Sequence, residues 1–538
     1  MVGAVASSLD SNATVENCMA IGCTLIGVKK VGSVVGYSAG STVKGNYAEN
    51  CTIVFSEKEA GEVLGYENTG STVEGNTFEN IVFMPSAAAL AKEMTPDANG
   101  VINISRDYTI SGDWTSLKYS GEITINGYGH TLKGLNKPLL VGNAAAKLTI
   151  NDLTIANSEI GVAANENGLG TGAFLCFIDA YGSAAFNNCH LVASTVTGNE
   201  RAGGLLGYTS GENLSIKNCT VVDCEIKAVG GAAGLAEYSQ SNTIIEDSSV
   251  ENTTVEATED RTGKAALAGA VIGTVNNNTT LTNVTASGNT VKNYGAVGYS
   301  EMIGRVVSGK LTIDGQTVVS NAAALKAAIT SNATSICIKG EIDLKDVTLS
   351  GYNGTIVGAD GTAVLNTRNF TPSRDEAYQL RSQKLTFKNI SFKLPTNINW
   401  LQSGFVGTGA IVFDNCSFEG QATLNGSATW TFNDCDFVST VSGNYASVVY
   451  GVNKATFNRC SFSGVDRAAK VYGTGGDLDV EYNTCTFTSS TLNKYGVEID
   501  ASYATTVVKL NTCSQTAMAG LYALEGSKGT VYVDGNQQ

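Results

Sequence analysis

The sequence FDNCSF, Phe413 to Phe418, holds the pattern that decides the fold: apolar residue, spacer, Asn, Cys, spacer, apolar residue. The pattern occurs fourteen times, and neighbouring copies lie 19 to 36 residues apart within each run. The other copies are VENCMA from Val15, AENCTI from Ala48, FENIVF from Phe78, INDLTI from Ile150, FNNCHL from Phe186, IKNCTV from Ile216, IEDSSV from Ile245, LTNVTA from Leu281, FKNISF from Phe387, FNDCDF from Phe432, FNRCSF from Phe457, YNTCTF from Tyr482 and LNTCSQ from Leu510. Such recurrence is typical of proteins in which each repeat packs on its neighbours. The sequence therefore predicts a stack of repeats.

Composition points to an all-β stack. The chain has 61 Gly but only 5 Pro in 538 residues, and charged residues make up 15%. With abundant Asn, Thr, Ser and Val, this mix suits short strands joined by tight turns. A hydrophobic content of 43% is too high for a disordered chain. A repeat of this length fits a coil of three short strands, so we expect a parallel β-helix, a solenoid whose coils stack roughly 4.8 Å apart.

In such a stack each repeat position becomes a column of like residues. Ile, Leu, Val or Ser replaces Cys in some copies, which indicates a small buried slot and a ladder of thiols. The ladder residues are Cys18, Cys51, Cys189, Cys219, Cys416, Cys435, Cys460, Cys485 and Cys513, beside Asn17, Asn50, Asn188, Asn218 and Asn415. The Asn side chains would bond along the stack at a corner. Occasional disulfides between adjacent coils and a metal site are the alternatives to free thiols.

A second motif alternates Gly with aliphatic residues. It occurs as VGSVVGY from Val31, AGEVLGY from Ala60, AGGLLGY from Ala202, VGGAAGL from Val229, AGAVIGT from Ala268 and YSEMIGR from Tyr299. These segments resemble the GLUG-motif repeats of bacterial cell-surface proteins of the Bacteroidetes type, over residues 1–84 and 184–310. The resemblance implies a cell-surface repeat module and no particular activity.

Two short amphipathic segments interrupt the strand pattern. SAAALAKEM from Ser86 and SNAAALKAAITSN from Ser320 predict capping helices near 86–94 and 320–331. A helix leading into stacked coils would cover the open apolar end of a solenoid. The arrangement resembles the N-terminal cap of the pectate-lyase-like right-handed parallel β-helix superfamily, which implies a right-handed solenoid. We therefore expect β-helix segments at 1–84, 85–319 and 320–538, with one continuous stack as the alternative.

Charge and hydropathy exclude several partners. The formal net charge of −15 and pI near 4.7 disfavour nucleic acid, whose phosphates require clustered Lys and Arg. No apolar run approaches the ~20 residues of a membrane span. The opening MVGAVASSLD has neither a basic leader nor a long apolar core. We expect this chain to be the mature region of a longer exported protein, extracellular or on the cell surface, with its signal or anchor elsewhere.

Candidate ligand contacts are few. The segment Thr367–Lys384 breaks the repeat and carries the highest local charge density, in Arg368, Arg374, Asp375, Glu376 and Arg381. Its arginines suit an anionic sugar. Three aromatic residues in loop-like sequence suit stacking on sugar rings: Trp114, Trp400 and Tyr445. No catalytic residue, metal site or cofactor is predicted.

These observations favour a non-catalytic secreted or cell-surface protein that acts as an adhesin, a glycan-binding protein or a structural scaffold. A rigid stack tolerates long loops at its corners, and such loops commonly bind ligands. The alternatives are a polysaccharide lyase or glycoside hydrolase of the β-helix type, and a phage tail-spike or fibre protein. The partner would be a polysaccharide or a cell-surface glycan, and the oligomeric state is left open.

Overall fold

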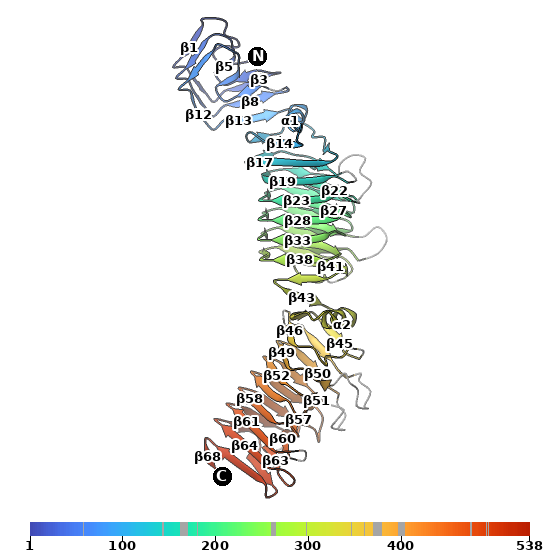
Figure 1. Ribbon diagram of the computed structural model, residues 1–538. Coiled ribbons are helices and arrows are strands. Elements are labelled where there is room, and N and C mark those ends of the chain that lie inside the picture. The colour runs from blue at the N-terminus through green and yellow to red at the C-terminus, as the bar shows by residue number, and fades with distance from the viewer. Residues whose placement is uncertain are drawn as a thin grey trace. The chain divides into compact units, whose positions relative to one another are not determined.

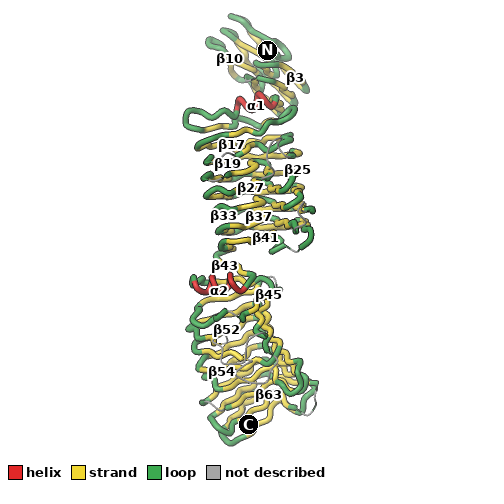
Figure 2. Tube along the Cα trace, turned by 90° about the vertical axis from the view of Figure 1, so that its right-hand side faces the viewer, coloured by secondary structure: helices red, strands yellow, loops and turns green. Residues whose placement is uncertain are grey.

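The computed structural model describes the chain except residues 58, 143–144, 162–169, 180, 260–264, 297, 346, 360, 369–378, 396–403, 474–475, 491 and 493, and the side chains of 379, 404 and 405. The chain forms two compact units, Met1–Asp314 and Gly315–Gln538. Both consist mainly of short strands, and the described residues form two helices (Figure 1 and Figure 2). The expectation of an all-β protein is confirmed. The predicted boundary at 319/320 lies five residues after the division, and the predicted segments 1–84 and 85–319 lie in the first unit up to Asp314.

The second unit contains three sheets in which each strand pairs in parallel with the equivalent strand of the next repeat. The first sheet contains β43 (Gln316–Val319), β44 (Ser335–Ile338), β46 (Gly354–Gly358), β49 (Lys384–Lys388), β52 (Ala410–Asp414), β55 (Thr429–Asn433), β58 (Lys454–Asn458), β61 (Leu478–Asn483), β64 (Thr506–Asn511), β67 (Gly529–Val533) and the antiparallel β68 (Asn536–Gln537). The second contains β45 (Glu341–Asp343), β47 (Val364–Asn366), β50 (Ser391–Lys393), β53 (Ser417–Glu419), β56 (Asp436–Ser439), β59 (Ser461–Gly464), β62 (Thr486–Ser489) and β65 (Ser514–Thr516). The third contains β48 (Gln379–Leu380), β51 (Gly404–Gly407), β54 (Ala422–Gly426), β57 (Tyr445–Tyr450), β60 (Arg467–Tyr472), β63 (Tyr495–Asp500) and β66 (Gly520–Glu525). From β46 to β66, one strand from each sheet makes up a layer.

The first unit begins with five small parallel sheets in residues 14–85, which we call the N-terminal segment. These sheets are β1 (Thr14–Glu16), β6 (Thr42–Lys44), β11 (Thr72–Glu74); β2 (Met19–Ile21), β7 (Tyr47–Glu49), β12 (Thr77–Glu79); β3 (Thr24–Gly27), β8 (Thr52–Phe55), β13 (Val82–Pro85); β4 (Val31–Gly32), β9 (Ala60–Gly61); and β5 (Val35–Ser38), β10 (Leu64–Glu67). The segment has its own cluster of buried apolar side chains, which includes Val15, Val43 and Ala48.

The rest of the first unit forms four further sets of parallel strands. The largest contains β14 (Val101–Asn103), β15 (Tyr108–Thr109), β17 (Glu122–Lys133), β19 (Lys147–Ala156), β23 (Ser183–Asn187), β24 (His190–Val192), β28 (Asn213–Lys217), β29 (Thr220–Val222), β33 (Asn242–Glu246), β34 (Ser249–Glu251), β38 (Thr279–Thr282), β39 (Thr285–Ser287) and β42 (Leu311–Ile313). The second contains β16 (Leu117–Lys118), β18 (Leu140–Val141), β22 (Leu175–Ile178), β27 (Leu206–Thr209), β32 (Ala236–Ser239), β37 (Ile272–Asn276) and β41 (Ile303–Ser308). The last two contain β20 (Glu159–Ile160), β25 (Thr195–Thr197), β30 (Glu225–Ala228), β35 (Thr254–Ala257), β40 (Thr290–Lys292); and β21 (Thr171–Gly172), β26 (Arg201–Gly203), β31 (Gly231–Ala233), β36 (Leu267–Gly269).

The six-residue pattern of FDNCSF, which we call the phrase, bends the chain at the same position in each of its fourteen copies. Its third residue has a positive φ in every copy, between 47° and 56°, as in Asn50, Asn218 and Asn415. Asn and Asp tolerate this left-handed conformation better than other non-glycine residues, which explains why they dominate the position. The side-chain amides also bond between layers: Asn415 Nδ2 donates to Asn389 Oδ1 at 2.9 Å. The phrase therefore forms the end of one strand, a corner with a left-handed residue, and the start of the next strand.

We expect Asn415→Ala to destabilise the second unit by about 1–2 kcal/mol, because alanine is strained in the left-handed region and loses the amide bond to Asn389. Asn415→Gly accepts the same φ without strain and serves as the matched variant. Urea denaturation of both variants measures the difference. Equal stability of the alanine and glycine variants would contradict the role assigned to the corner.

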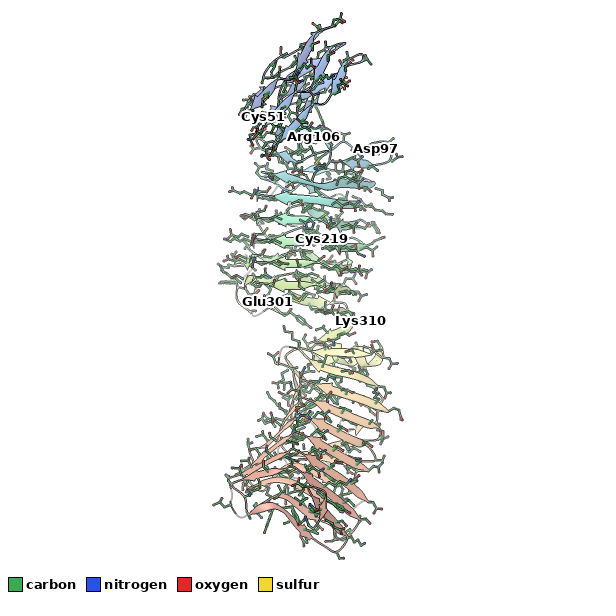
Figure 3. All side chains as sticks on the ribbon, turned by 90° about the vertical axis from the view of Figure 1, so that its left-hand side faces the viewer. Cys51, Asp97, Arg106, Cys219, Glu301 and Lys310 are labelled. Atoms are coloured by element: carbon green, nitrogen blue, oxygen red, sulfur yellow. The ribbon has the colours of Figure 1, made fainter. Side chains whose placement is uncertain are left out.

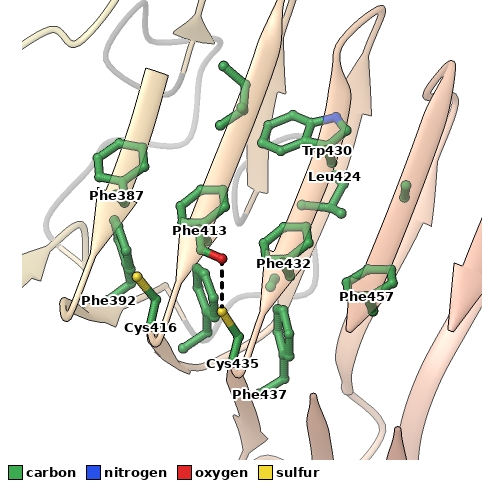
Figure 4. Close-up of a cluster of buried hydrophobic side chains, with 14 of the residues drawn as sticks. Phe387, Phe392, Phe413, Cys416, Leu424, Trp430, Phe432, Cys435, Phe437 and Phe457 are labelled. Carbon is green, nitrogen blue, oxygen red and sulfur yellow. Dashed lines mark hydrogen bonds between the residues drawn. The ribbon is translucent and has the colours of Figure 1, made fainter. Parts of the chain in front are cut away.

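Aromatic and thiol columns fill the second unit. The ring centroids of Phe413, Phe432 and Phe457 follow one another at 4.8 and 4.9 Å, with ring planes within 9° of parallel (Figure 4). A second column contains Phe418, Phe437 and Phe462 at 4.7 and 4.8 Å. Edge-on contacts join the two columns, as between Phe413 and Phe418 at 5.3 Å. This packing satisfies the preferred geometries of aromatic pairs in both directions.

The cysteines of the phrase lie beside these rings. Six of these thiols donate to the carbonyl of the residue that begins the phrase one layer before, for example Cys435 Sγ to Phe413 O at 3.5 Å and Cys460 Sγ to Phe432 O at 3.5 Å. In the first unit, Cys219 occupies the same place and donates to Phe186 O at 3.4 Å (Figure 3). All thirteen cysteines lie within the described residues, and none of them is in a disulfide. A buried thiol with a carbonyl partner behaves as a small apolar side chain, so these cysteines contribute packing.

Both predicted helical segments are helices. Helix α1 spans Ala87–Glu93 with Ser86 as N-cap, whose side chain accepts from Ala89 N. Helix α2 spans Ala322–Thr330, and its N-cap is Asn321, one residue after the predicted Ser320. Asn321 can act as the N-cap because its Oδ1 accepts a hydrogen bond from the backbone N–H of Ala324 at 2.9 Å. Each helix buries one apolar side, for example Leu90 in α1 and Leu325 in α2.

Candidate functional site

A face of polar and aromatic side chains lies on strands β57, β60 and β63 of the second unit. Along β60, Ala469 and Val471 are buried, while Lys470 and Tyr472 lie on the other side of the sheet and are partly exposed. This alternation follows from the two-residue period of a strand. Parallel register then places Lys470 beside Glu498. We call this surface the tyrosine face.

Tyr445 holds the face together. Its hydroxyl donates to Glu498 Oε2 at 2.6 Å, two strands away, and accepts from Arg467 Nη1 at 3.3 Å. The guanidinium carbon of Arg467 lies 5.1 Å from the Tyr445 ring centroid. Burial, followed by the hydrogen bond to the Glu498 carboxylate, raises the pKa of Tyr445 well above its usual value. The hydroxyl therefore stays protonated and fixes the position of the carboxylate.

A small pocket opens beside this network, with a volume of about 270 Å³. Its lining residues combine ammonium groups, carboxylates and apolar surface: Lys470, Lys494, Tyr495, Glu498, Ile499, Asp500, Ala523, Leu524 and Glu525. Lys470 Nζ lies 4.9 Å from the Tyr472 ring centroid, so the pocket edge continues into an aromatic surface. Donors and acceptors around a partly apolar rim match a polyhydroxylated ring.

The structure brings one predicted contact residue into this site. The expectation that Tyr445 is an exposed loop residue is corrected: it lies in β57 with only 7% of its surface exposed, so it belongs to the site as a support. Trp114 offers no face to a ligand: its side chain is fully buried, and its Nε1 donates to Pro138 O at 3.1 Å. The expectation that Trp114 is exposed is therefore corrected, since this strand-free segment packs into the core.

The charged segment is only partly described. Arg374, Asp375, Glu376 and Trp400 lie outside the described residues. Arg368 forms an ion pair with Glu419 and its backbone N–H donates to Asn366 Oδ1 at 3.0 Å, so its charge is already balanced within the protein. Arg381 is exposed and directly follows β48, the first strand of the sheet that carries the tyrosine face. It does not line the pocket.

Lys470, Glu498 and Asp500 were not predicted. Lys470 lies in RAAKVY, the sequence of β60, and Glu498 and Asp500 lie at alternate positions of YGVEID, the sequence of β63. The equivalent strand one repeat before β60 is β57, with the sequence YASVVY. Aligning these three segments on their tyrosines and aliphatic residues would have placed Lys470 next to Glu498. That signal is weak, because the segments share no motif with the repeated phrase.

Glu237, in the first unit, was also missed. The register pairs Ala202 with Ala232 and Tyr208 with Tyr238. The segment equivalent to AGGLLGY is therefore AAGLAEY, from Ala232. The prediction that VGGAAGL, from Val229, is the copy of the second motif in this layer is wrong. Glu237 therefore stands where AGGLLGY has Gly207. TGAFLCF from Thr171 is a further copy, with Cys176 at the same position.

The Glu237 carboxyl is 2% exposed and lies against Arg201, with Nε to Oε2 at 3.3 Å. Gly231 makes room for it, because a Cβ there would meet Glu237 Oε1 at 2.2 Å. Thr274 Oγ1 lies 3.5 Å from the same oxygen, and Arg201 stacks on the Tyr208 and Tyr238 rings. Burial raises the pKa of Glu237 to about 8, although Arg201 and Arg305 act in the opposite direction.

Comparisons with known proteins add no identification: no protein-family model, curated protein or solved structure matches the chain. Over the described residues, no group of three or more His, Cys, Asp or Glu side chains is placed to hold a metal ion. None of the helices in the described part of the chain has the length and apolar content needed to cross a membrane.

Proposed function

We propose that the parallel sheets of each unit close into a right-handed parallel β-helix of the pectate-lyase-like type, with GLUG-motif repeats in the first unit. Three observations support this proposal. Each layer of the second unit from β46 to β66 contributes one strand to each of three sheets. Equivalent residues pair in register from layer to layer, as Phe413 does with Phe432. The left-handed corner recurs in all fourteen copies of the phrase.

We further propose that the protein is a non-catalytic secreted or cell-surface protein that binds a glycan at the tyrosine face. The single observation that carries this proposal is the pocket beside Tyr445, in which lysine donors, carboxylate acceptors and an aromatic edge surround a space of about 270 Å³. Sugar rings are bound by such combinations of hydrogen-bonding groups and aromatic faces. The stacked layers beneath supply a rigid support.

A polysaccharide lyase or glycoside hydrolase is the second candidate, because Glu498 and Asp500 line the same pocket from one strand. Acid–base cleavage of a glycan needs two groups near the scissile bond. Incubation with neutral oligosaccharides, pectin, alginate and glycosaminoglycans, followed by assays for new reducing or unsaturated ends, separates the two candidates. New ends would favour the enzyme, and binding without cleavage would favour the scaffold.

For binding, we expect Lys470→Ala and Glu498→Gln each to weaken the affinity for the recognised oligosaccharide at least tenfold, because the first removes an ammonium donor and the second replaces a carboxylate acceptor by an amide in the pocket lining. The matched control is Lys454→Ala, on β58 of the first sheet, where the ammonium lies 3.8 Å from Asp479. Calorimetric titration of the full chain measures the affinities. Failure of every oligosaccharide to bind, or unchanged binding by both pocket variants, would contradict the proposal.

A further inference from the structure

The last layer of the N-terminal segment is uncovered on one side. Val73 pairs in register with Val43, and Phe78 with Ala48, so both occupy interior positions of their sheets. Val43 and Ala48 are fully buried, whereas Val73 is 38% and Phe78 is 57% exposed. The cause is that β11 and β12, within the described part of the chain, pair only with β6 and β7. Interior apolar side chains thus face solvent at this end.

These residues border a pocket of about 380 Å³. Its lining consists of Glu62, Val63, Leu64, Gly65, Tyr66, Glu67, Val73, Asn76 and Phe78. The pocket thus combines three aliphatic side chains, two aromatic rings and two carboxylates, and no basic side chain lines it. A lining that combines apolar and aromatic side chains with carboxylates favours a ligand that is apolar along its length and positively charged at its end.

In the same segment, the ammonium group of Lys30 lies against the stacked rings of Tyr37 and Tyr66. Tyr37 and Tyr66 stack with centroids 6.0 Å apart and ring planes 4° from parallel. Lys30 Nζ lies 4.0 Å from the Tyr37 centroid and 4.5 Å from the Tyr66 centroid. Because β10 pairs only with β5 among the described strands, no equivalent tyrosine follows Tyr66 on the side away from Tyr37. That ring remains 37% exposed at the pocket.

Arg106 is a second cation near the pocket that contacts both an aromatic ring and a carboxylate. The guanidinium carbon of Arg106, a residue labelled in Figure 3, lies 4.4 Å from the Phe83 centroid, and its Nη1 lies 3.5 Å from Glu62 Oε1. Arg106 therefore balances Glu62. Glu67 takes part in none of the ion pairs found over the described residues, so its carboxylate is the charge that a ligand would meet.

We propose that this pocket binds the side chain of a lysine from a protein partner. The four methylene groups would pack on Val63, Leu64 and Val73, and the ammonium would lie against the rings of Tyr66 and Phe78 with Glu67 as its counter-ion. An amino sugar fits less well, because its ammonium is attached to a polar ring without an apolar stem. This site is separate from the tyrosine face and does not depend on the glycan proposal.

The test uses the full chain and saturation-transfer NMR with three probes: Nα-acetyl-lysine methylamide, its Nε-acetylated form, and the uncharged norleucine equivalent. We expect saturable transfer to the lysine methylene protons only for the charged probe. Tyr66→Ala and Glu67→Gln are expected to weaken its binding at least fivefold, whereas Tyr128→Ala and Glu251→Gln, exposed or partly exposed sites elsewhere in the first unit, leave it unchanged.

Glu67→Gln is the deciding variant, because it keeps the shape of the pocket while Tyr66→Ala could loosen the end layer. Absence of saturable transfer, unchanged binding by Glu67→Gln, or equal binding of the norleucine probe would overturn the proposal. Displacement of the lysine probe by glucosamine oligomers at lower concentration than by lysine would assign the pocket to an amino sugar instead.

Discussion

Replacing Phe432 by alanine is expected to destabilise the second unit by about 3–5 kcal/mol, the range for deleting a buried aromatic side chain. Phe432 is fully buried and sits in the middle of its column, with Phe413 at 4.8 Å on one side and Phe457 at 4.9 Å on the other. It also meets Phe437 edge-on at 5.3 Å. Backbone hydrogen bonds between paired strands fix the spacing of neighbouring layers. The layers therefore cannot move together to fill the cavity that the substitution leaves.

Urea denaturation followed by far-UV circular dichroism measures this loss. Phe432→Leu retains most of the buried volume and is expected to cost only about 1–2 kcal/mol. Val438→Ala, at an outward position of β56 that is 37% exposed, is expected to change stability by less than about 0.5 kcal/mol. A loss below about 1 kcal/mol for Phe432→Ala would show that Phe432 is not in the interior.

The second large effect concerns Glu237 and pH. Its pKa is raised from 4.5 to about 8 by burial in the folded protein. Between these values the folded state binds a proton that the unfolded state has lost, so stability falls as pH rises through this window. The contribution is fully present below about pH 4.5 and is lost above about pH 8. At about 1.4 kcal/mol per pKa unit, the change is on the order of 4–5 kcal/mol.

Glu237→Gln removes the titrating group and keeps nearly the same shape. We therefore expect the variant to be less sensitive than the wild-type protein to a shift from pH 5 to pH 8.5, when unfolding of the first unit is followed in urea. Glu246→Gln serves as the control, because Glu246 is a partly exposed residue on β33 whose carboxylate pairs with Lys217 at 3.4 Å. Identical pH dependence of Glu237→Gln and wild type would mean that Glu237 titrates normally.

The repeated phrase predicts the columns because a strand has a fixed period and parallel register preserves position. The structure accordingly stacks Phe413, Phe432 and Phe457. The second motif was harder to align, since glycines recur at several offsets within it. Tyr208 and Tyr238, which carry larger side chains, are the reliable anchors, and they would have shown Glu237 in a glycine position.

The candidate site could be predicted only in part, for two physical reasons. Loop-like sequence does not imply exposure: the segment around Trp114 packs against Pro138 and Leu139 and buries the indole. A binding face on a sheet, by contrast, is assembled from residues that lie a whole repeat apart, 28 positions for Lys470 and Glu498. Each looks like an ordinary surface charge when read along the chain. Tyr445 was singled out as an aromatic residue in loop-like sequence, but the structure places it in β57 and buries it.

The central claim is that successive copies of the phrase lie directly above one another, and sulfur positions test it most directly. A sulfur-anomalous diffraction map of the crystalline protein should show Cys416, Cys435, Cys460, Cys485 and Cys513 as one row with a spacing of about 4.8 Å. Sulfur peaks from these five residues scattered through the second unit would contradict the stacked layers, and with them the rigid support on which the tyrosine face depends.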